Sequence, residues 1–241
     1  MTQNQRLASS LTLLQSLDHF DQLESVLQQI CGRFGVKQMA FLVIRVGIEQ
    51  ARFRHYSTTY PKRWVETYLA GNLYKTDPVI DILKWSRRPV DWSVLDTERY
   101  RKFFKDSRES GVGCNGMTIP LRGPRGERCL FSVTSDLSIP DWLLLKNDCA
   151  EELCIISHFV HEKALSLLAQ ASHTPRPVLS RRERQCLEQV ATGYIPKQIA
   201  ARLSISESSV RLFLRAARRK LDAKTSHQAV ARASFFEMID I

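Results

Sequence analysis

The residues most suited to chemistry lie between positions 60 and 92. Large rings with polar tips stand there beside one well-placed carboxylate: Tyr60, Trp64, Tyr68, Tyr74, Asp77 and Trp92. Trp64 and Tyr68 are four residues apart, so on a helix they share a face and can line one cavity. Such rings suit a pocket that is mostly apolar but must fix the orientation of one ligand. The alternative is that they form core, because aromatic residues at helical spacing are also typical of a packed interior.

Catalysis finds little support in the sequence. None of the six histidines has an obvious partner, and the Gly-x-Ser-x-Gly motif that presents a nucleophilic serine is absent. His158 and His161 are three residues apart on an expected helix, with Glu162 beside them, but a solvated helix face explains this spacing better than a metal site does. We therefore predict no enzyme, no metal and no cofactor. A lactone or thioester hydrolase with a DNA-binding tail is the rival that a turnover assay would revive.

The C-terminal stretch has the local signals of a helix-turn-helix. Ser180 and Glu183 form a capping box that begins a helix at the next residue after the serine, and Gly193 is placed to end it. Pro196 suits the first position of a short second helix, which runs to Leu203.

The third helix of this stretch is expected to enter DNA. It is capped by Ser206, and only Ser204 and Ile205 separate it from the second helix, so the two helices must cross steeply. Apolar residues at helical spacing define its buried face: Val210, Leu214, Ala217 and Leu221. Arginines that can neutralise phosphates fall to one side of that stripe: Arg211, Arg215, Arg218 and Arg219.

Base contacts are expected from residues that face away from the buried stripe. These residues are Ser208, Ser209, Leu212, Arg215, Ala216 and Arg219. The ones near the N-terminal end of the helix would reach base edges if the helix lies in the major groove. Leu212 is apolar on a wet face, so it either touches a thymine methyl group or is covered by a neighbouring side chain.

Charge and composition point to a polyanionic partner for the end of the chain. The net charge is +10, and residues 176–241 hold 13 Lys and Arg against 6 Asp and Glu, whereas residues 1–175 hold 22 against 19. The basic excess therefore coincides with the helix-turn-helix. No signal peptide precedes residue 20, no apolar run reaches the ~18 residues of a membrane span, and the six scattered cysteines are expected to be buried free thiols. These features predict a soluble, cytoplasmic protein without a membrane partner.

The first 169 residues have the pattern of an α/β unit. Helices are expected within 7–34 and at 61–71, 79–87, 97–110 and 139–169, and strands at 37–46, 51–57, 116–121 and 128–135. Residues 170–177 contain two prolines and no periodicity, as a linker does. The predicted fold class is therefore α+β. Residues 1–169 form an α-β-α sandwich with an antiparallel sheet, and residues 178–241 form an all-α helix-turn-helix domain.

These features together resemble the LuxR-type quorum-sensing regulators. The resemblance rests on the order and spacing of Tyr60, Trp64, Tyr68, Asp77-Pro78, Trp92, Gly116, Glu183, Leu187 and Gly193. It covers nearly the whole chain, and the aromatic residues carry its specificity because many two-component response regulators share the helix-turn-helix. A response regulator would also need a doubly wound receiver domain, and residues 1–60 lack the required alternation of strands and helices.

The resemblance implies that residues 1–169 bind an autoinducer, an N-acyl homoserine lactone with a fatty or aryl acyl group. Trp64 would donate its indole N–H to the lactone carbonyl, and Asp77 would accept the amide N–H of the ligand. Tyr60 and Ser132 would hold the acyl carbonyl. A buried carboxylate is costly unless it accepts hydrogen bonds, so filling this pocket should stabilise the domain.

Three further residues would complete the pocket. Tyr68 would pack along the acyl group, Trp92 would pack against the lactone ring, and Gly116 would keep the space near the head group clear. The resemblance also implies a homodimer formed through the helix at 139–169, which binds promoter DNA, with RNA polymerase as a further candidate partner.

Several positions depart from the pattern of the family. Tyr194 and Gln198 stand where Lys and Glu are common, Phe213 replaces a common His, and the chain ends Phe-Phe-Glu-Met-Ile-Asp-Ile in place of the frequent Gly-Leu-Ile. Operator preference, and the choice between activation and repression, therefore stay open. The alternative function is a regulator of the same architecture that is ligand-independent or answers a non-lactone signal. The joint presence of Trp64, Asp77 and Trp92 argues against it.

Overall fold

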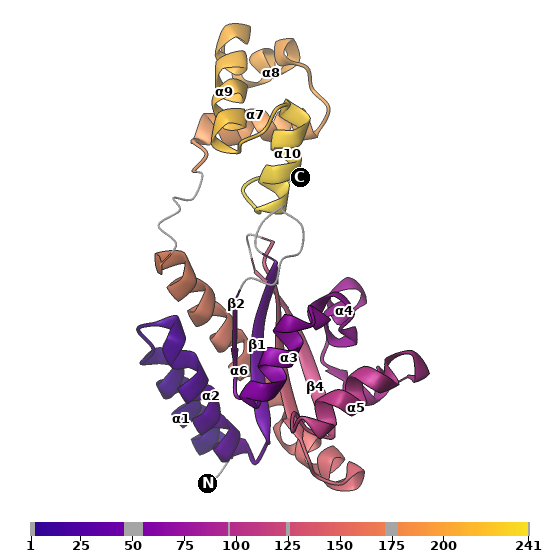
Figure 1. Cartoon of the computed structure of the whole chain (residues 1–241). Helices are drawn as coiled ribbons and strands as arrows, with labels where there is room; N and C mark the ends of the chain where they lie inside the picture. The colour runs from indigo at the N-terminus through magenta and orange to yellow at the C-terminus, as the bar shows by residue number, and fades with distance from the viewer. Residues whose placement is uncertain (1–2, 46–54, 96, 124–125, 172–177, 241) are drawn as a thin grey trace. The chain divides into compact units, whose positions relative to one another are not determined.

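The chain folds into two units, each of which is described by itself (Figure 1). The structure is a computed structural model and describes residues 3–45, 55–95, 97–123, 126–171 and 178–240. The first unit holds a sheet with helices α1 to α6, and the second holds helices α7 to α10.

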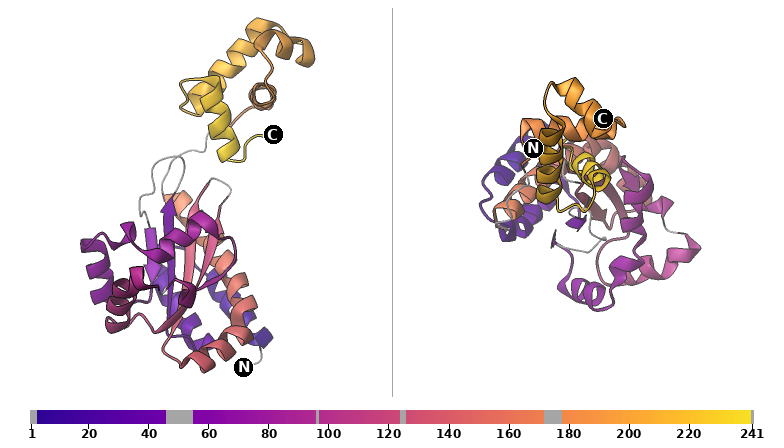
Figure 2. Two further views of the ribbon diagram at one scale, coloured as in Figure 1. Left: turned by 90° about the vertical axis from the view of Figure 1, so that its right-hand side faces the viewer. Right: turned by 90° about the horizontal axis from the view of Figure 1, so that it is seen from above.

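The first unit is a three-layered sandwich, as its two views show (Figures 1 and 2). Its sheet has the strand order β2-β1-β5-β4-β3, and every neighbouring pair is antiparallel. The strands are β1 (Gln38–Arg45), β2 (His55–Thr58), β3 (Val90–Asp91), β4 (Asn115–Arg122) and β5 (Arg128–Ser135). One face is covered by α1 (Gln3–Gln15), α2 (Leu23–Phe34) and α6 (Ile139–Ala171), and the other by α3 (Lys62–Ala70), α4 (Pro78–Trp85) and α5 (Arg101–Glu109).

The two faces of the sheet have different interiors. Side chains alternate along each strand, so Phe41 and Phe131 point to the α1, α2 and α6 side, where they are fully buried in a dense apolar core. Leu42 and Leu130 point to the α3 to α5 side, where a smaller cluster contains most of the aromatic residues singled out above. The α+β class predicted from the sequence is confirmed, because one sheet packs between two helical layers.

Element boundaries follow local signals where these exist. Gly35 ends α2 in the left-handed conformation (φ 64°), which costs glycine little. The helix expected at 97–110 is split into a 3₁₀ turn, η4 (Glu98–Tyr100), and α5. Helix α6 continues to Ala171, so it enters the expected linker by two residues, and the rest of that linker lies outside the described residues. Val46 and residues 51–54 of the expected strands also lie outside them.

Two expectations about polar side chains need correction. The solvated helix face holds for His158, but His161 is buried and packs edge-on against Phe41, with ring centroids 6.4 Å apart. Burial lowers the pKa of His161. All six cysteines are free, but Cys114 is exposed rather than buried and Cys154 is half-buried. No group of His, Cys, Asp and Glu suited to a metal ion occurs among the residues that the structure describes.

The second unit is all-helical. It contains α7 (Arg181–Ala191), α8 (Pro196–Leu203), α9 (Glu207–Lys220) and α10 (Ser226–Phe235). The predicted capping box is present, because the Ser180 hydroxyl accepts from the Glu183 amide while Glu183 accepts from the Ser180 amide at 2.7 Å. Ser204 takes a left-handed conformation (φ 53°) in the short turn between α8 and α9. Across the described ranges of both units, no helix combines the length and apolarity required to span a membrane.

Candidate functional site

A cavity of about 70 Å³ lies between the sheet and helices α3 to α5 of the first unit. Six of the seven residues expected to hold a ligand line it: Tyr60, Trp64, Tyr68, Asp77, Trp92 and Ser132. They come from the segment between β2 and α3, from α3 itself, from the N-cap of α4, from η3 (Trp92–Val94) and from β5. The structure thus brings together side chains that are up to 72 positions apart in the sequence.

One transverse row of the sheet forms a polar part of the cavity region. Strand register aligns Thr58, Ala40, Ser132, Thr118 and Val90 across all five strands. The hydroxyls of Thr118 and Ser132 lie 2.8 Å apart and share a hydrogen bond, and Tyr60 hydrogen-bonds to Ser132. Burial raises the pKa of the Tyr60 hydroxyl, so this phenol stays neutral and can donate or accept.

Asp77 is the buried charge of the site. Its side chain caps α4 by accepting from the Val79 amide at 2.7 Å, and its second oxygen accepts from the Tyr68 hydroxyl at 2.7 Å. Burial raises the pKa of Asp77 to about 6, although these hydrogen bonds act in the opposite direction. Tyr68 was expected to pack along an acyl group, and in the structure its hydroxyl also orients the carboxylate.

The two tryptophans of the cavity are held differently. The indole N–H of Trp92 donates to the Thr118 hydroxyl at 2.8 Å. The Trp64 ring packs edge-on against Phe103 at 5.8 Å, and its N–H has no hydrogen-bond partner in the part of the chain that the structure describes. An unpaired donor and a buried acceptor, Asp77, therefore face the same cavity. A small molecule that offers both a carbonyl and an N–H would give the Trp64 N–H an acceptor and the Asp77 carboxylate a further donor.

Gly116 does not line the cavity, in contrast to the other six residues. It lies behind Trp92, and a Cβ atom at position 116 would stand 2.5 Å from Cδ2 of the Trp92 indole. The space that this glycine keeps clear is therefore the space occupied by the Trp92 ring.

Gly116→Ala should destabilise the first unit by about 1–3 kcal/mol, because the added methyl group forces the Trp92 ring to move. Gly32→Ala is the matched control: its Cβ on α2 would meet nothing within 4 Å, so we expect a gain of up to ~1 kcal/mol from helix propensity. Urea unfolding followed by tryptophan fluorescence measures both, since all four tryptophans lie in the first unit. Equal stabilities of the two variants would contradict the prediction.

The raised pKa of Asp77 predicts how the stability of this unit depends on pH. The folded state holds the Asp77 proton more tightly than the unfolded state, in which the pKa is near 3.8. This contribution is fully present below about pH 4 and is lost as the pH rises through about 6. The free energy of unfolding of the wild type, relative to Asp77→Asn, should fall by up to ~3 kcal/mol between pH 4 and pH 7. If the difference in free energy of unfolding between the wild type and Asp77→Asn stays constant from pH 4 to pH 7, the raised pKa of Asp77 is refuted.

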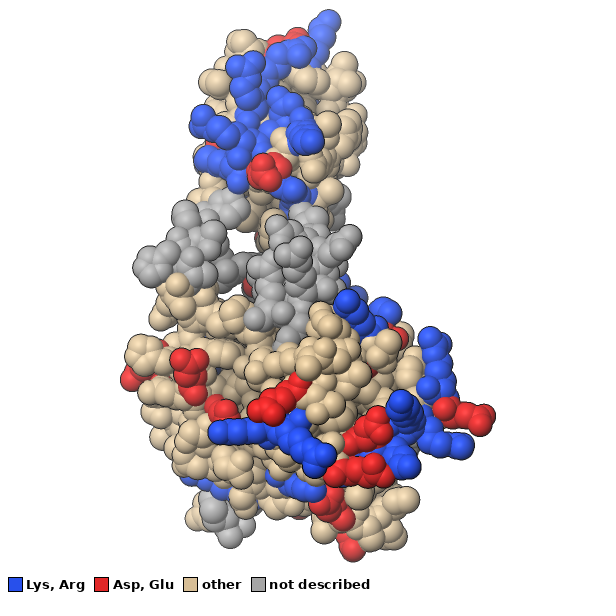
Figure 3. All heavy atoms as spheres, viewed as in Figure 1, with Lys and Arg blue, Asp and Glu red and all other residues tan. Residues whose placement is uncertain are grey.

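The second unit presents a basic surface along α9. Figure 3 shows Lys and Arg side chains gathered over this unit with few acidic ones between them. Exposed residues on the face opposite the buried stripe are Ser208, Leu212, Arg215 and Arg219. Leu212 is 61% exposed, so no neighbour within this unit covers it, in contrast to one of the two alternatives given for it.

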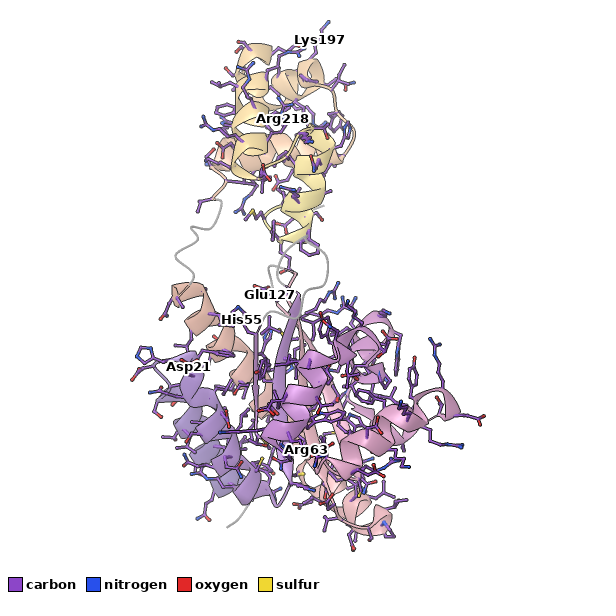
Figure 4. The ribbon with its side chains drawn as sticks, in the orientation of Figure 1. Asp21, His55, Arg63, Glu127, Lys197 and Arg218 are labelled. Atoms are coloured by element: carbon purple, nitrogen blue, oxygen red, sulfur yellow. The ribbon has the colours of Figure 1, made fainter. Side chains whose placement is uncertain are left out.

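The remaining residues of the expected DNA surface have partners within the unit. Arg211 pairs with Glu207 at 2.5 Å, and Ser209 bonds to the Ser206 hydroxyl at 2.8 Å, as does Ser208. Arg218 is half-buried and donates to the Lys224 carbonyl at 3.3 Å. Figure 4 shows Arg218 over the middle of the unit, whereas Lys197, near the start of α8, extends outward. Lys197 was missed by the sequence analysis, although it directly follows the Pro196 that begins α8.

Two family matches now account for both units. The autoinducer binding domain matches residues 20–164, and the domain of bacterial regulatory proteins of the luxR family matches residues 177–233. The chain belongs to the LuxR family. As a LuxR-family regulator it binds an autoinducer as its signal and DNA through its helix-turn-helix, and it is a transcription regulator rather than an enzyme.

Individual relatives agree with this LuxR-family assignment. The chain is 42% identical over 172 residues to the transcriptional activator RaiR of Rhizobium etli. The matched region spans 70% of this chain and 71% of RaiR. It is 31% identical over 185 residues to the quorum-sensing regulator RhlR of Pseudomonas aeruginosa. The matched region spans 75% of this chain and 74% of RhlR. The fold is that of Escherichia coli SdiA, with a TM-score of 0.75, 21% identity and 98% of each chain covered. A structure of SdiA in complex with octanoyl-rac-glycerol matches with a TM-score of 0.70 at 20% identity.

The sequence analysis missed Thr118 and Phe103 in this regulator. Thr118 is fully buried, and its hydroxyl links Trp92 to Ser132. Both residues lie in predicted strands, at 116–121 and 128–135, but their pairing depends on the strand register, which the sequence pattern did not give. Phe103 lies on α5, and the polar composition of that helix concealed its apolar face.

Proposed function

We propose that this LuxR-family regulator recognises an N-acyl homoserine lactone and, as a homodimer, binds promoter DNA through α9. The observation that carries the proposal is the pairing of Trp64 and Asp77 on one cavity: a free indole N–H and a buried carboxylate at the wall of the same space. An acyl homoserine lactone offers a lactone carbonyl to the first and an amide N–H to the second. A ligand without the carbonyl would leave the Trp64 N–H unsatisfied, which costs about 1–3 kcal/mol, and a ligand without the N–H would form no further hydrogen bond with Asp77.

The rest of the ligand is assigned by the same chemistry. The hydroxyls of Tyr60 and Ser132 hydrogen-bond to each other and can together hold the acyl carbonyl. Trp92 offers its ring to the lactone, since its N–H is already bonded to Thr118. The hydrocarbon chain would lie against apolar lining residues such as Leu42, Val79 and Leu130.

A ligand panel tests the recognition. We expect N-acyl homoserine lactones to raise the melting temperature of the purified full chain, with one acyl length best. The panel should include 1-octanoyl-glycerol, because SdiA forms a complex with that molecule. Stabilisation by the glycerol ester alone would favour a non-lactone signal. Stabilisation by no member of the panel, together with no co-purifying small molecule in native mass spectrometry, would favour the ligand-independent alternative.

The proposed dimer rests on an apolar stripe of α6. Leu144, Ile155 and Phe159 are exposed by 69%, 41% and 38%, and at 3.6 residues per turn they fall within about 60° of one another. A second copy of the helix would cover this stripe. Contact of the promoter-bound dimer with RNA polymerase also belongs to the proposal.

Ile155→Glu with Phe159→Glu should convert the ligand-bound dimer to a monomer, because two carboxylates would be buried in the interface. Ile139→Glu is the matched control: Ile139 is 68% exposed on the same helix but about 160° around it from Ile155. Sedimentation velocity measures the result. A double variant that sediments as the wild type does would remove α6 from the interface.

A further inference from the structure

Asp91 lies on the edge strand of the sheet, between the two cores of the first unit. In β3, Val90 pairs with Thr118 and Asp91 pairs with Met117. Because side chains alternate, Val90 joins the cluster around the cavity, while Asp91 projects to the opposite face, which α6 covers. Trp92, the next residue, returns to the cavity. Asp91 thus lies on one side of the sheet while its two neighbours in the chain lie on the other.

The Asp91 carboxylate joins the two sides. One oxygen accepts from two groups on α6, the Trp142 indole N–H at 3.1 Å and the Lys146 ammonium at 2.8 Å. The other oxygen accepts from the Ser93 amide at 3.0 Å and thereby caps η3, the turn that begins with Trp92. Burial alone would raise the pKa of Asp91, but the hydrogen bond from Lys146 and the other donors lower it, so the carboxylate is charged.

The two α6 donors act as a unit. Trp142 and Lys146 are four residues apart, so they share the face of α6 that meets Asp91. The Trp142 ring is buried and the Lys146 and Asp91 side chains are each only 21% exposed, so this contact is largely protected from solvent. An ion pair of this kind is screened less than one at the surface.

On the cavity side, two contacts fix the position of the Trp92 ring. Its indole N–H is bonded to Thr118, and the backbone of Gly116 lies directly behind its ring. A displacement of η3 would therefore move the ring within the cavity, and a ligand packed on the ring would resist that displacement.

We infer that Asp91 is a positioning residue that ties Trp92 in the pocket to the N-terminal part of α6, so that ligand binding and the order of α6 are coupled. The inference rests on the proposed function, because it takes the ligand to contact Trp92. Coupling is reciprocal: if the tie tightens the pocket, an occupied pocket tightens α6 to the same extent. The same helix carries the apolar stripe of the proposed dimer, so the tie gives the ligand a physical route to that surface.

Three single variants test the tie. Lys146→Met removes the cation, and Asp91→Asn keeps an acceptor for the Ser93 amide but removes the charge. Arg6→Met is the matched control, because Arg6 makes comparable ion pairs from α1 to Asp148 and Glu152 of α6 without approaching Trp92. Both test variants should weaken the affinity for N-octanoyl homoserine lactone by roughly fivefold to thirtyfold. The control should leave this affinity within about twofold of the wild type.

Amide hydrogen exchange provides a readout that a purely structural role would not move. In the wild type, N-octanoyl homoserine lactone should slow exchange over residues 139–150, and Lys146→Met should abolish this effect of the ligand while Arg6→Met retains it. Ligand protection that persists in Lys146→Met, or a loss of affinity that is the same in Arg6→Met, would overturn the inference.

A second arm separates this inference from the proposed function. If no lactone binds the wild type, the proposed function fails, but the tie can still be measured in the protein without added ligand. Lys146→Met should then speed exchange at residues 92–95, and Arg6→Met should not. Unchanged exchange there would overturn the tie on its own.

Discussion

The Asp77→Ala variant should lose its response to every N-acyl homoserine lactone. The carboxylate is buried, and the ligand amide would form a charge-assisted hydrogen bond with it, worth about 1.5–3 kcal/mol. The Kd should therefore weaken by roughly tenfold to more than a hundredfold. Transcription from a reporter promoter should then show little response at ligand concentrations near the Kd of the wild type. Isothermal titration and a dose–response curve measure the two effects.

Two control variants show whether the loss of ligand affinity is specific to the Asp77 carboxylate. Asp77 also caps α4, so Asp77→Ala costs about 1 kcal/mol of stability irrespective of any ligand. Asp77→Asn keeps an oxygen for the Val79 amide but turns an N–H₂ group towards the ligand, so it should retain the cap and still lose affinity. Asp81→Ala, one turn along α4 in an exposed pair with Lys84, should bind as the wild type does. An unchanged dose response of Asp77→Ala would rule the lactone assignment out.

The second large effect concerns DNA. Arg215→Ala with Arg219→Ala should weaken binding to a short duplex of arbitrary sequence by about a hundredfold at physiological salt. Both guanidinium groups are exposed on the outer face of α9, with no bonded partner among the described residues, so each is free to neutralise a phosphate. The slope of log K against log salt should fall by about 2, because two fewer counterions are released. Fluorescence anisotropy over a salt series measures both quantities.

The control keeps the charge change constant. Arg181→Ala with Arg184→Ala removes two exposed arginines from α7 and lowers the net charge equally. If general electrostatics alone attracted the duplex, both double variants would lose the same affinity and the same slope. That result would refute α9 as the DNA-contacting helix.

The sequence was most informative where structure has a local cause. The capping box of Ser180 and Glu183, the N-cap Ser206 and the helix-starting Pro196 each act within a few residues, and each prediction made from them is confirmed. The five-stranded sheet was only partly foreseen, because β3 has two residues and no pattern of its own. Its position depends on the register with β4, which is a long-range property.

In the candidate site, too, features with a local cause could be predicted and features that depend on long-range packing could not. The resemblance to the family implied all six residues that line the cavity, but local patterns do not show which atoms bond to which. The bond from Trp92 to Thr118, the place of Gly116 behind the Trp92 ring and the contact of Asp91 with Lys146 all depend on how strands align and which way side chains alternate. On α9, likewise, only the structure shows that Arg211 and Arg218 have bonded partners whereas Arg215 has none among the described residues.

The alternation of side chains along β1 and β5 has a consequence for how such receptors diversify. Residues such as Phe41 and Phe131 on one side belong to a rigid frame, whereas Ala40, Leu42, Leu130 and Ser132 on the other side touch the cavity. A substitution at an even-numbered position of these strands can reshape the signal that is admitted without disturbing the frame on the reverse side. Ligand selectivity and fold stability thus depend on adjacent residues of the same strands, yet the two properties can vary independently.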